Sequence, residues 1–444
     1  MSSQDPTDPS TPTGRRLPKA LTPFRHAAYR RLAVALTLST FASGVWIVGL
    51  VWEVIRIDGG PAQLSAVSTA SAVGVLLPAL LGGVVADRVP QKLILLTVAA
   101  VELCGMTAVA VLSLTGTTAL WQLGVVSFVT GAGMAFYYPA YSAWLPALVP
   151  EQDLMAVNGF EGMVRPTVGQ AVGPGVAGVA VGVASPGAAV AIAAVASLLG
   201  IAALTLVPLT PVRRDLGGET DGEPRGPFAS AYADVREGFG YMLRTPWLLA
   251  TLLFASLLVL VMMGPLEVLV PFLVKDGLGG DAGDHAWVLA AFGIGGAVGS
   301  FAMASLSMPR RYLTWMNLTW GVGCLPFLAM GFASAVWQLV AAAFVLGATF
   351  SAPMVIWGTL LQRRVPPHML GRVSSLDFFV SVSLMPVSMA LAGPVSEAIG
   401  LRATFAIAGI VPGVVAVVAI VWARLPEDEL AHPLRDEPAE AVSV

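Results

Sequence analysis

Four acidic side chains lie inside long apolar runs of the sequence: Glu53, Glu102, Glu267 and Asp377. Placing a carboxylate at the centre of a membrane helix costs about 2.5–3.5 kcal/mol even on the mildest scales, so such groups are functional candidates. A carboxyl group that loses its hydration binds a proton more readily. The chemistry these residues offer is therefore the uptake and release of protons.

Glu53 and Glu267 occupy comparable places in the two halves of the chain. We expect one of them to bind and release a proton whose movement is coupled to the function of the protein. Glu267 follows Gly264-Pro265 and lies deeper in its apolar run, which favours it. Glu53 lies beside Arg56, and a hydrated surface pair explains it equally well. Glu102 suits a buried hydrogen bond to a neighbouring helix, and Asp377 lies close to the end of its run.

A charged hinge, residues 82–92, separates two apolar runs and is the best candidate for a gate. Its two glycines allow another helix to approach closely, and its carboxylate can face the N-terminus of a distant helix. The alternative is a solvated turn whose charges only set the topology. The gating candidates are Gly83, Asp87, Arg88, Lys92, Arg372 and Asp377.

The elements that position these groups are membrane helices. Hydrophobic residues make up 56% of the 444 and charged residues only 11%, with a net charge of −3, which excludes a soluble globular protein and disfavours nucleic acid as a partner. About 20 apolar residues cross the hydrocarbon. Twelve runs of that kind are expected at residues 31–55, 62–86, 92–114, 119–142, 159–183, 187–208, 247–273, 286–307, 312–332, 335–358, 376–396 and 403–423.

The basic residues orient this layout. With the N-terminus inside, 21 of the 24 Lys and Arg residues fall on the cytoplasmic side, and only Arg56, Lys275 and Arg402 fall outside. We expect a multi-pass plasma-membrane protein with both termini cytoplasmic. The expected organisation is a disordered tail (1–25), a six-helix bundle (26–208), a linker with an amphipathic helix (209–246), a second six-helix bundle (247–424) and a disordered tail (425–444).

An offset of 216 residues aligns the two halves. It pairs Val149-Pro150 with Val365-Pro366, and Gly131 with Gly347. The fold predicted is therefore all-α, with twelve transmembrane helices in two pseudo-symmetric bundles, the internal repeat typical of one transporter architecture.

These features resemble the major facilitator superfamily. Gly83-x-x-x-Asp87-Arg88-x-x-x-Lys92 is similar to its loop 2–3 signature, although Pro90-Gln91 departs from it. Residues 135–140, 145–150 and 369–373 resemble the branch with the enterobactin exporter and macrolide efflux pumps. The fifth span resembles an exporter signature of the superfamily at Gly169, Gly173, Pro174 and Gly178.

The resemblance implies a substrate cavity lined by spans one, four, seven and ten. Aromatic and methionine side chains there suit a bulky amphipathic ligand, although helix packing is the alternative. Many drug–proton antiporters carry an arginine four residues before the glycine that corresponds to Gly131. This chain has Ser127 at that position. The cavity candidates are Trp46, Phe136, Tyr137, Tyr138, Tyr141, Met262, Met263, Trp337, Phe350 and Trp357.

Enzyme and metal signatures are absent from the sequence, so we expect no cofactor beyond a proton gradient. Cys104 and Cys324 are interpreted as small core residues, and none of the four histidines is expected at membrane depth. The predicted function is a monomeric, proton-coupled exporter of an amphipathic small molecule such as a drug, a secreted metabolite or a siderophore. The alternatives are an importer of the same fold and a membrane sensor or scaffold that transports nothing.

Overall fold

The computed structural model describes residues 19–79, 85, 88–150, 153–209, 227–306 and 308–434, and nearly all of them are helical. Helices are expected here because backbone N–H groups in hydrocarbon must find partners within their own segment. The first half contains η1 (Lys19–Arg25), α1 (Ala27–Arg56), α2 (Pro61–Leu76), α4 (Gln91–Thr115), α5 (Leu120–Leu148), α6 (Leu154–Val164), η3 (Arg165–Val172), α7 (Gly173–Val183) and α8 (Pro186–Thr205).

The second half begins after a linker whose residues 210–226 lie outside the described part. It contains α9 (Pro227–Arg244), α10 (Pro246–Gly264), η4 (Pro265–Leu269), α11 (Val270–Phe272), η5 (Leu273–Gly277), α12 (Ala282–Ala304), α13 (Tyr312–Val322), α14 (Leu325–Gly331), α15 (Val336–Arg364), α16 (Pro367–Ser383), α17 (Met385–Ile399), α18 (Leu401–Trp422) and α19 (Leu425–Ala431). The linker helix predicted from its periodicity is α9, which packs against α10 and α16.

Nine helical stretches in the described residues are long and apolar enough to cross a bilayer. The other three predicted crossings fall on α2, on α6 through α7, and on α13 with α14, which are shorter or interrupted. The all-α fold class is therefore confirmed, and the predicted runs account for the helices in chain order.

Proline residues explain why two spans are interrupted. Pro166 lies in η3, Pro265 begins η4, and Pro271 precedes η5, and all three of these segments are π-helical. Proline lacks the N–H that an α-helix needs, and the wider π turn accommodates the missing bond. Spans five and seven consequently contain the π-helical segments of the described residues.

Glycine contacts repeat in both halves and support the sequence repeat. In the first half, a side chain at Gly131 would collide with the carbonyl oxygen of Ser71 on α2. In the second half, a side chain at Gly347 would collide with the carbonyl oxygen of Phe292 on α12. Small residues let helix backbones approach this closely. The fourth and tenth spans therefore pack against the second and eighth in the same way.

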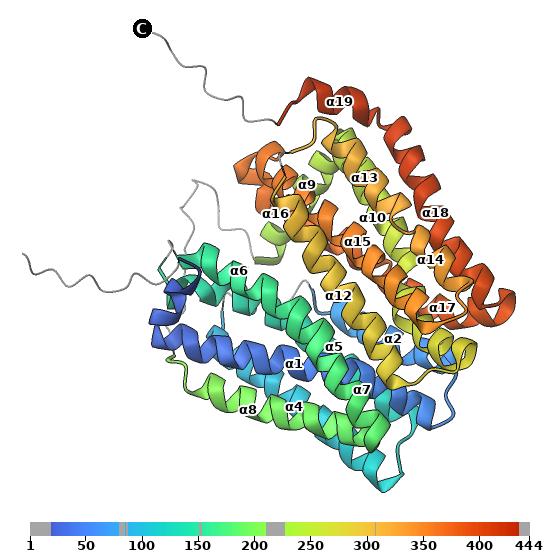
Figure 1. Ribbon diagram of the computed structural model, residues 1–444. Helices are drawn as coiled ribbons and strands as arrows, with labels where there is room; N and C mark the ends of the chain where they lie inside the picture. The colour runs from blue at the N-terminus through green and yellow to red at the C-terminus, as the bar shows by residue number, and fades with distance from the viewer. Residues whose placement is uncertain are drawn as a thin grey trace, which may run out of the picture.

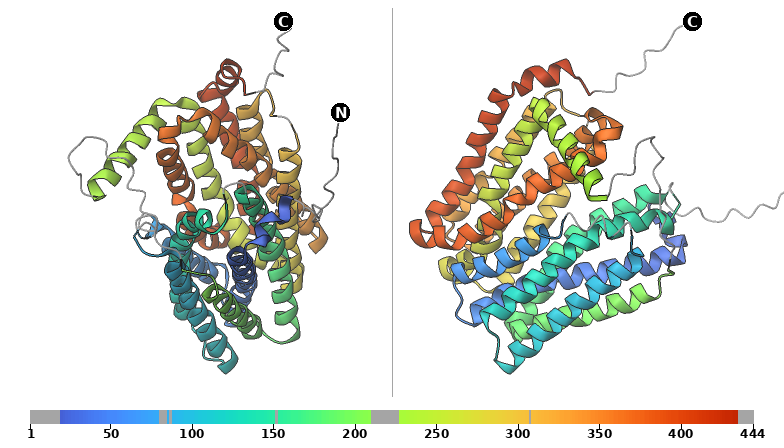
Figure 2. Two further views of the ribbon diagram at one scale, coloured as in Figure 1. Left: turned by 90° about the vertical axis from the view of Figure 1, so that its left-hand side faces the viewer. Right: turned by 180° about the vertical axis from the view of Figure 1, so that it is seen from behind.

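The two groups of helices converge where α2 lies beside α17 and α7 beside α12 (Figure 1). The helices α6, α9 and α19 lie toward the opposite end of the molecule (Figures 1 and 2). We call the converging end the closed face. It joins residues that are more than 300 positions apart, since the Gly393 amide donates a hydrogen bond to Ser65 Oγ at 2.7 Å.

Both tails are more ordered than the sequence indicated. Residues 19–25 were expected to be disordered, but they form η1, and Thr22 donates a hydrogen bond of 2.7 Å to Asp153 just before α6. Residues 425–431 form α19, in which the fully buried Glu429 accepts bonds from the Leu313 and Thr314 amides. Each tail is held by partners from distant helices, which local composition does not reveal.

Candidate transport pathway

The gating prediction falls partly outside the described residues, which exclude Gly83 and Asp87 and the side chain of Arg372. Arg88 is exposed. Lys92 donates to the carbonyl oxygens of Thr205 at 2.8 Å and Val207 at 2.6 Å. A cation at the C-terminal end of a helix satisfies carbonyls that have no partner in the helix. Lys92 thus ties the start of α4 to the end of α8, and its part in a gate stays a prediction.

Asp377, the last gating candidate, joins two helices of the second half. Its carboxylate accepts a hydrogen bond of 3.0 Å from Trp357 Nε1 on α15 and one of 3.3 Å from Ser381 Oγ on its own helix α16. The Trp357 ring in turn meets Trp247 of α10 edge to face, with 6.2 Å between the centroids. This arrangement gives Trp357 a packing role.

The fifth-span glycines contact one helix in each half. A side chain at Gly173 would lie 2.9 Å from the Cα of Gly44 on α1, and one at Gly169 would lie 2.9 Å from Thr40. A side chain at Gly178 would lie 2.9 Å from the carbonyl oxygen of Ala282 on α12. Pro174 is buried and lies next to Gly44. The motif therefore lets the fifth span pack closely against α1 of its own bundle and against α12 of the other bundle.

Glu53 forms a closed ion pair near the end of α1. Arg56 donates two hydrogen bonds to its carboxylate, of 2.9 and 2.7 Å, and Ser113 of α4 donates a third of 2.7 Å. The side chain of Glu53 is fully buried. A carboxylate with this many donors is held in its charged form, so the geometry favours Glu267 over Glu53 as the group that carries a proton.

Glu267 lies on the π-helical segment η4, which contacts α2 of the first half and α17 and α18 of the second. The neighbours Leu266 and Val268 are buried, whereas Glu267 is exposed. Glu267 is therefore an accessible carboxylate at the contact between the two bundles.

The cavity candidates divide by exposure. Tyr138 is 58% exposed, and Phe136, Tyr137, Met263 and Phe350 are partly buried. The buried candidates, which serve mainly as packing, are Trp46, Tyr141, Met262 and Trp357. Trp337, 68% exposed, lies at the start of α15 and is better explained as an anchor at the membrane boundary.

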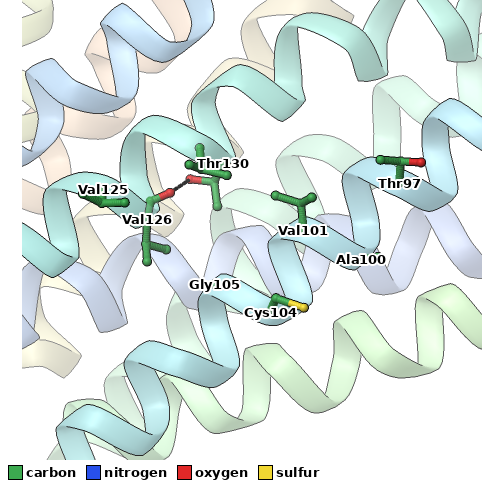
Figure 3. Close-up of a pocket in the computed structure, with 9 residues that line it drawn as sticks. Thr97, Ala100, Val101, Cys104, Gly105, Val125, Val126 and Thr130 are labelled. Carbon is green, nitrogen blue, oxygen red and sulfur yellow. Dashed lines mark hydrogen bonds between the residues drawn. The ribbon is translucent and has the colours of Figure 1, made fainter.

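A groove of about 460 Å³ lies between α4 and α5 and is lined mostly by apolar atoms (Figure 3). Cys104 lines this groove and is exposed, so its interpretation as a core residue is wrong, whereas Cys324 is buried as expected. The sequence places both in apolar runs and cannot separate a lipid-facing position from a buried one. An acyl chain suits such a groove better than a transported polar solute does.

Three polar residues outside the candidate sites are placed at informative positions. His285 is 2% exposed and lies in the first turn of α12, at one end of a candidate span, and the expectation that no histidine reaches membrane depth stays a prediction. Glu161 and Arg165 form an ion pair with 4.0 Å between nitrogen and oxygen at the start of the fifth span. Their spacing of four residues, which predicts such a pair on a helix, was the available indication.

The remaining candidate, Glu102, is buried on α4 beside α5. A side chain added at Gly133 would lie 3.9 Å from its carboxylate oxygen. This position agrees with a packing role between the two helices.

Two bundles of membrane helices with mirrored glycine contacts are the architecture of a membrane transporter. The protein is not an enzyme. The family model for transmembrane secretion effectors (MFS_3) matches residues 18–443, and the chain belongs to this family of the major facilitator superfamily.

Relatives and solved structures agree with this family. The multidrug efflux pump Tap of Mycolicibacterium fortuitum is 27% identical over 413 residues, which cover 90% of this chain and 96% of Tap. Macrolide efflux protein A of Streptococcus pyogenes is 22% identical over 77% of this chain and 83% of its own length. The nucleoside transporter NupG superposes with a TM-score of 0.72 at 12% identity, over 89% of this chain and 99% of NupG.

Proposed function

We propose that the protein is a proton-coupled exporter that moves an amphipathic small molecule across the plasma membrane by alternating access. The substrate is a drug, a secreted metabolite or a siderophore, and both termini are cytoplasmic. Efflux relatives over nine-tenths of the chain support the direction of transport. The observation that carries proton coupling is the position of Glu267 where the two halves meet.

The π turn gives Glu267 the setting that a proton carrier needs. Its exposed side chain lies between buried neighbours at the contact with α2, so its charged state depends on the conformation around it. Because η4 touches α2 and α17, any separation of these helices changes the hydration of Glu267. Proton binding and opening of the closed face are then linked.

The substrate surface offers aromatic and thioether groups. Exposed Tyr138, with partly buried Phe136, Met263 and Phe350, presents apolar area with little directional demand. Surfaces of this kind bind ligands that differ in detail but share an apolar body. Arg165, whose guanidinium lies 5.6 Å from the centre of the Tyr138 ring, adds a charge next to that surface.

Reconstitution into liposomes with an imposed pH gradient tests the coupling. Glu267→Gln keeps the size of the side chain and removes its titration, and we expect it to abolish transport driven by the gradient. Glu397→Gln is the matched control, since Glu397 is an exposed carboxylate near the end of α17. Gradient-driven transport by Glu267→Gln at the wild-type rate would remove Glu267 from the mechanism.

An importer of the same fold is the second candidate, and vesicle orientation separates the two. An exporter accumulates substrate in everted vesicles and an importer in right-side-out vesicles. Substrates for this assay come from a toxicity panel that compares cells overproducing the protein with cells lacking it, together with extracellular metabolite profiling.

A further inference from the structure

The start of the fifth span buries three polar atoms that have no hydrogen-bond partner among the described residues. They are the hydroxyl oxygens of Tyr29 and Tyr141 and the Oε1 atom of Glu161. The two tyrosines are 0% and 1% exposed. Leaving a buried polar group unpaired costs about 1–3 kcal/mol, and native proteins rarely do so without a reason.

The three atoms belong to one site. Tyr29 and Tyr141 belong to one buried cluster that also packs against Phe160, the residue before Glu161, and the Tyr141 hydroxyl interacts with the Glu161 carboxylate. Phe24 of η1 covers the site, with its ring 5.3 Å from that of Tyr29 and 5.1 Å from that of Phe160. The site is thus closed by aromatic rings and contains one carboxylate.

The Arg165 guanidinium lies between two partners. Its guanidinium is 4.0 Å from Glu161, which is the loose limit of an ion pair, and 5.6 Å from the centre of the Tyr138 ring. The Arg165 side chain is 44% exposed, whereas that of Glu161 is 13% exposed. A cation over an aromatic ring is stabilised by about 0.5–1 kcal/mol at exposed sites, so Arg165 can leave Glu161 at low cost.

We propose that Glu161, Tyr29 and Tyr141 form a proton-binding site in the first bundle, separate from Glu267. A proton from a hydronium ion adds to the Glu161 carboxylate, leaves a water molecule and gives a neutral carboxyl group. Arg165 keeps its own proton, loses its ion pair with Glu161 and retains Tyr138 as its partner. Proton binding therefore removes one partner of an arginine that borders the substrate surface.

Other titratable groups near the site are placed differently. Tyr137 of α5 stacks on Tyr141 with 5.9 Å between ring centroids, and its other neighbour is Glu102 of α4. His26 and Asp153 pair with each other at 3.1 Å at the start of α6. Each of these groups has a partner or a neighbour of its own, which leaves Glu161 as the carboxylate that the two tyrosine hydroxyls face.

Infrared difference spectroscopy of the purified full-length protein between about pH 5 and about pH 9 tests the proposal without any substrate. Protonated carboxyl groups absorb apart from carboxylates, and we expect Glu161→Gln to remove one titrating component. Glu267→Gln should leave this component in place. A titration identical to wild type in folded Glu161→Gln would overturn the proposal.

Two further variants test the composition of the site and remain informative if Glu161→Gln does not fold. Tyr141→Phe removes a hydroxyl that stabilises the charged carboxylate, so the midpoint should move to higher pH by about half a unit to one unit. Arg165→Gln removes the cationic partner of the charged form, so the midpoint should move to higher pH by about one to three units. A shift to lower pH in either variant, or none, would refute the assigned roles.

The inference rests on the proposed function only where it links this proton to transport. If Glu267→Gln stops gradient-driven transport and the Glu161 component is absent, the coupling proposal stands and this site is refuted. If the component is present and transport ignores the pH gradient, the site stands and coupling is refuted.

Discussion

The hydrogen bond between Ser65 and Gly393 should set how firmly the closed face holds. The Gly393 amide donates to Ser65 Oγ at 2.7 Å, and both atoms are buried between α2 and α17. In Ser65→Ala the amide loses this partner while the face is closed, but it can bond to water once the face opens. The closed state alone is therefore penalised.

The penalty for an unpaired buried amide is about 1–3 kcal/mol. It applies to one of two conformations, so the ratio of open to closed should rise by about 5- to 150-fold. Double electron–electron resonance can measure this ratio with spin labels at the exposed positions Ala66 and Ala398. Both native cysteines must be replaced first, because Cys104 is exposed and would also take a label.

Thr69→Val provides the matched control. Thr69 lies one turn further along α2, and its hydroxyl donates to the Ser65 carbonyl oxygen of the same helix at 2.6 Å. Loss of this bond affects both conformations equally, so the distance distribution should stay as in wild type. The reasoning fails if Ser65→Ala leaves the distribution unchanged or if Thr69→Val shifts it as far.

Three other predictions concern the packing of the bundles and tails. Hydrogen bonds from Thr22 and His26 hold the pKa of Asp153 below its usual range. Docking of η1 should therefore persist above about pH 4 and weaken as the pH falls further. Hydrogen exchange of η1 at several pH values would show this, and Asp153→Asn should remove the pH dependence of the exchange. Gly44→Ala should lower the free energy of unfolding by about 1–3 kcal/mol because the added methyl meets the fifth span, whereas Gly240→Ala meets nothing within 4 Å and should not, as thermal melts of both variants would test. Glu429→Gln should speed amide exchange at the start of α13, and equal protection of those amides in the mutant and wild type would contradict the capping role.

The sequence was sufficient to predict the helices and their packing motifs. Apolar runs of membrane length appear as helices in the order expected, because hydrocarbon leaves the backbone no other way to pair. Gly131, Gly347 and Gly173 lie at close helix contacts, as small residues in such runs indicate. These features depend on spacing within one segment, and spacing is visible in a sequence.

Features that depend on distant partners were not visible. Lys92 donates to carbonyls more than 110 residues away, which its place in the sequence does not indicate. Glu53 is satisfied by Ser113 of another helix. The two tails looked too polar to fold, yet Glu429 finds its donors in α13. In each case the side chain's role is set by a neighbour that only the folded chain supplies.

The π-helical segment η3 affects how the fifth span can change in evolution. A π turn holds one more residue than an α turn, and one residue corresponds to about 100° of rotation around a helix. Deleting a single residue between Arg165 and Val172 would convert a π turn into an α turn and leave Gly178 facing α12. A one-residue gap at this point between two relatives would therefore leave α7 aimed as before, and helical-wheel diagrams should be restarted at Gly173.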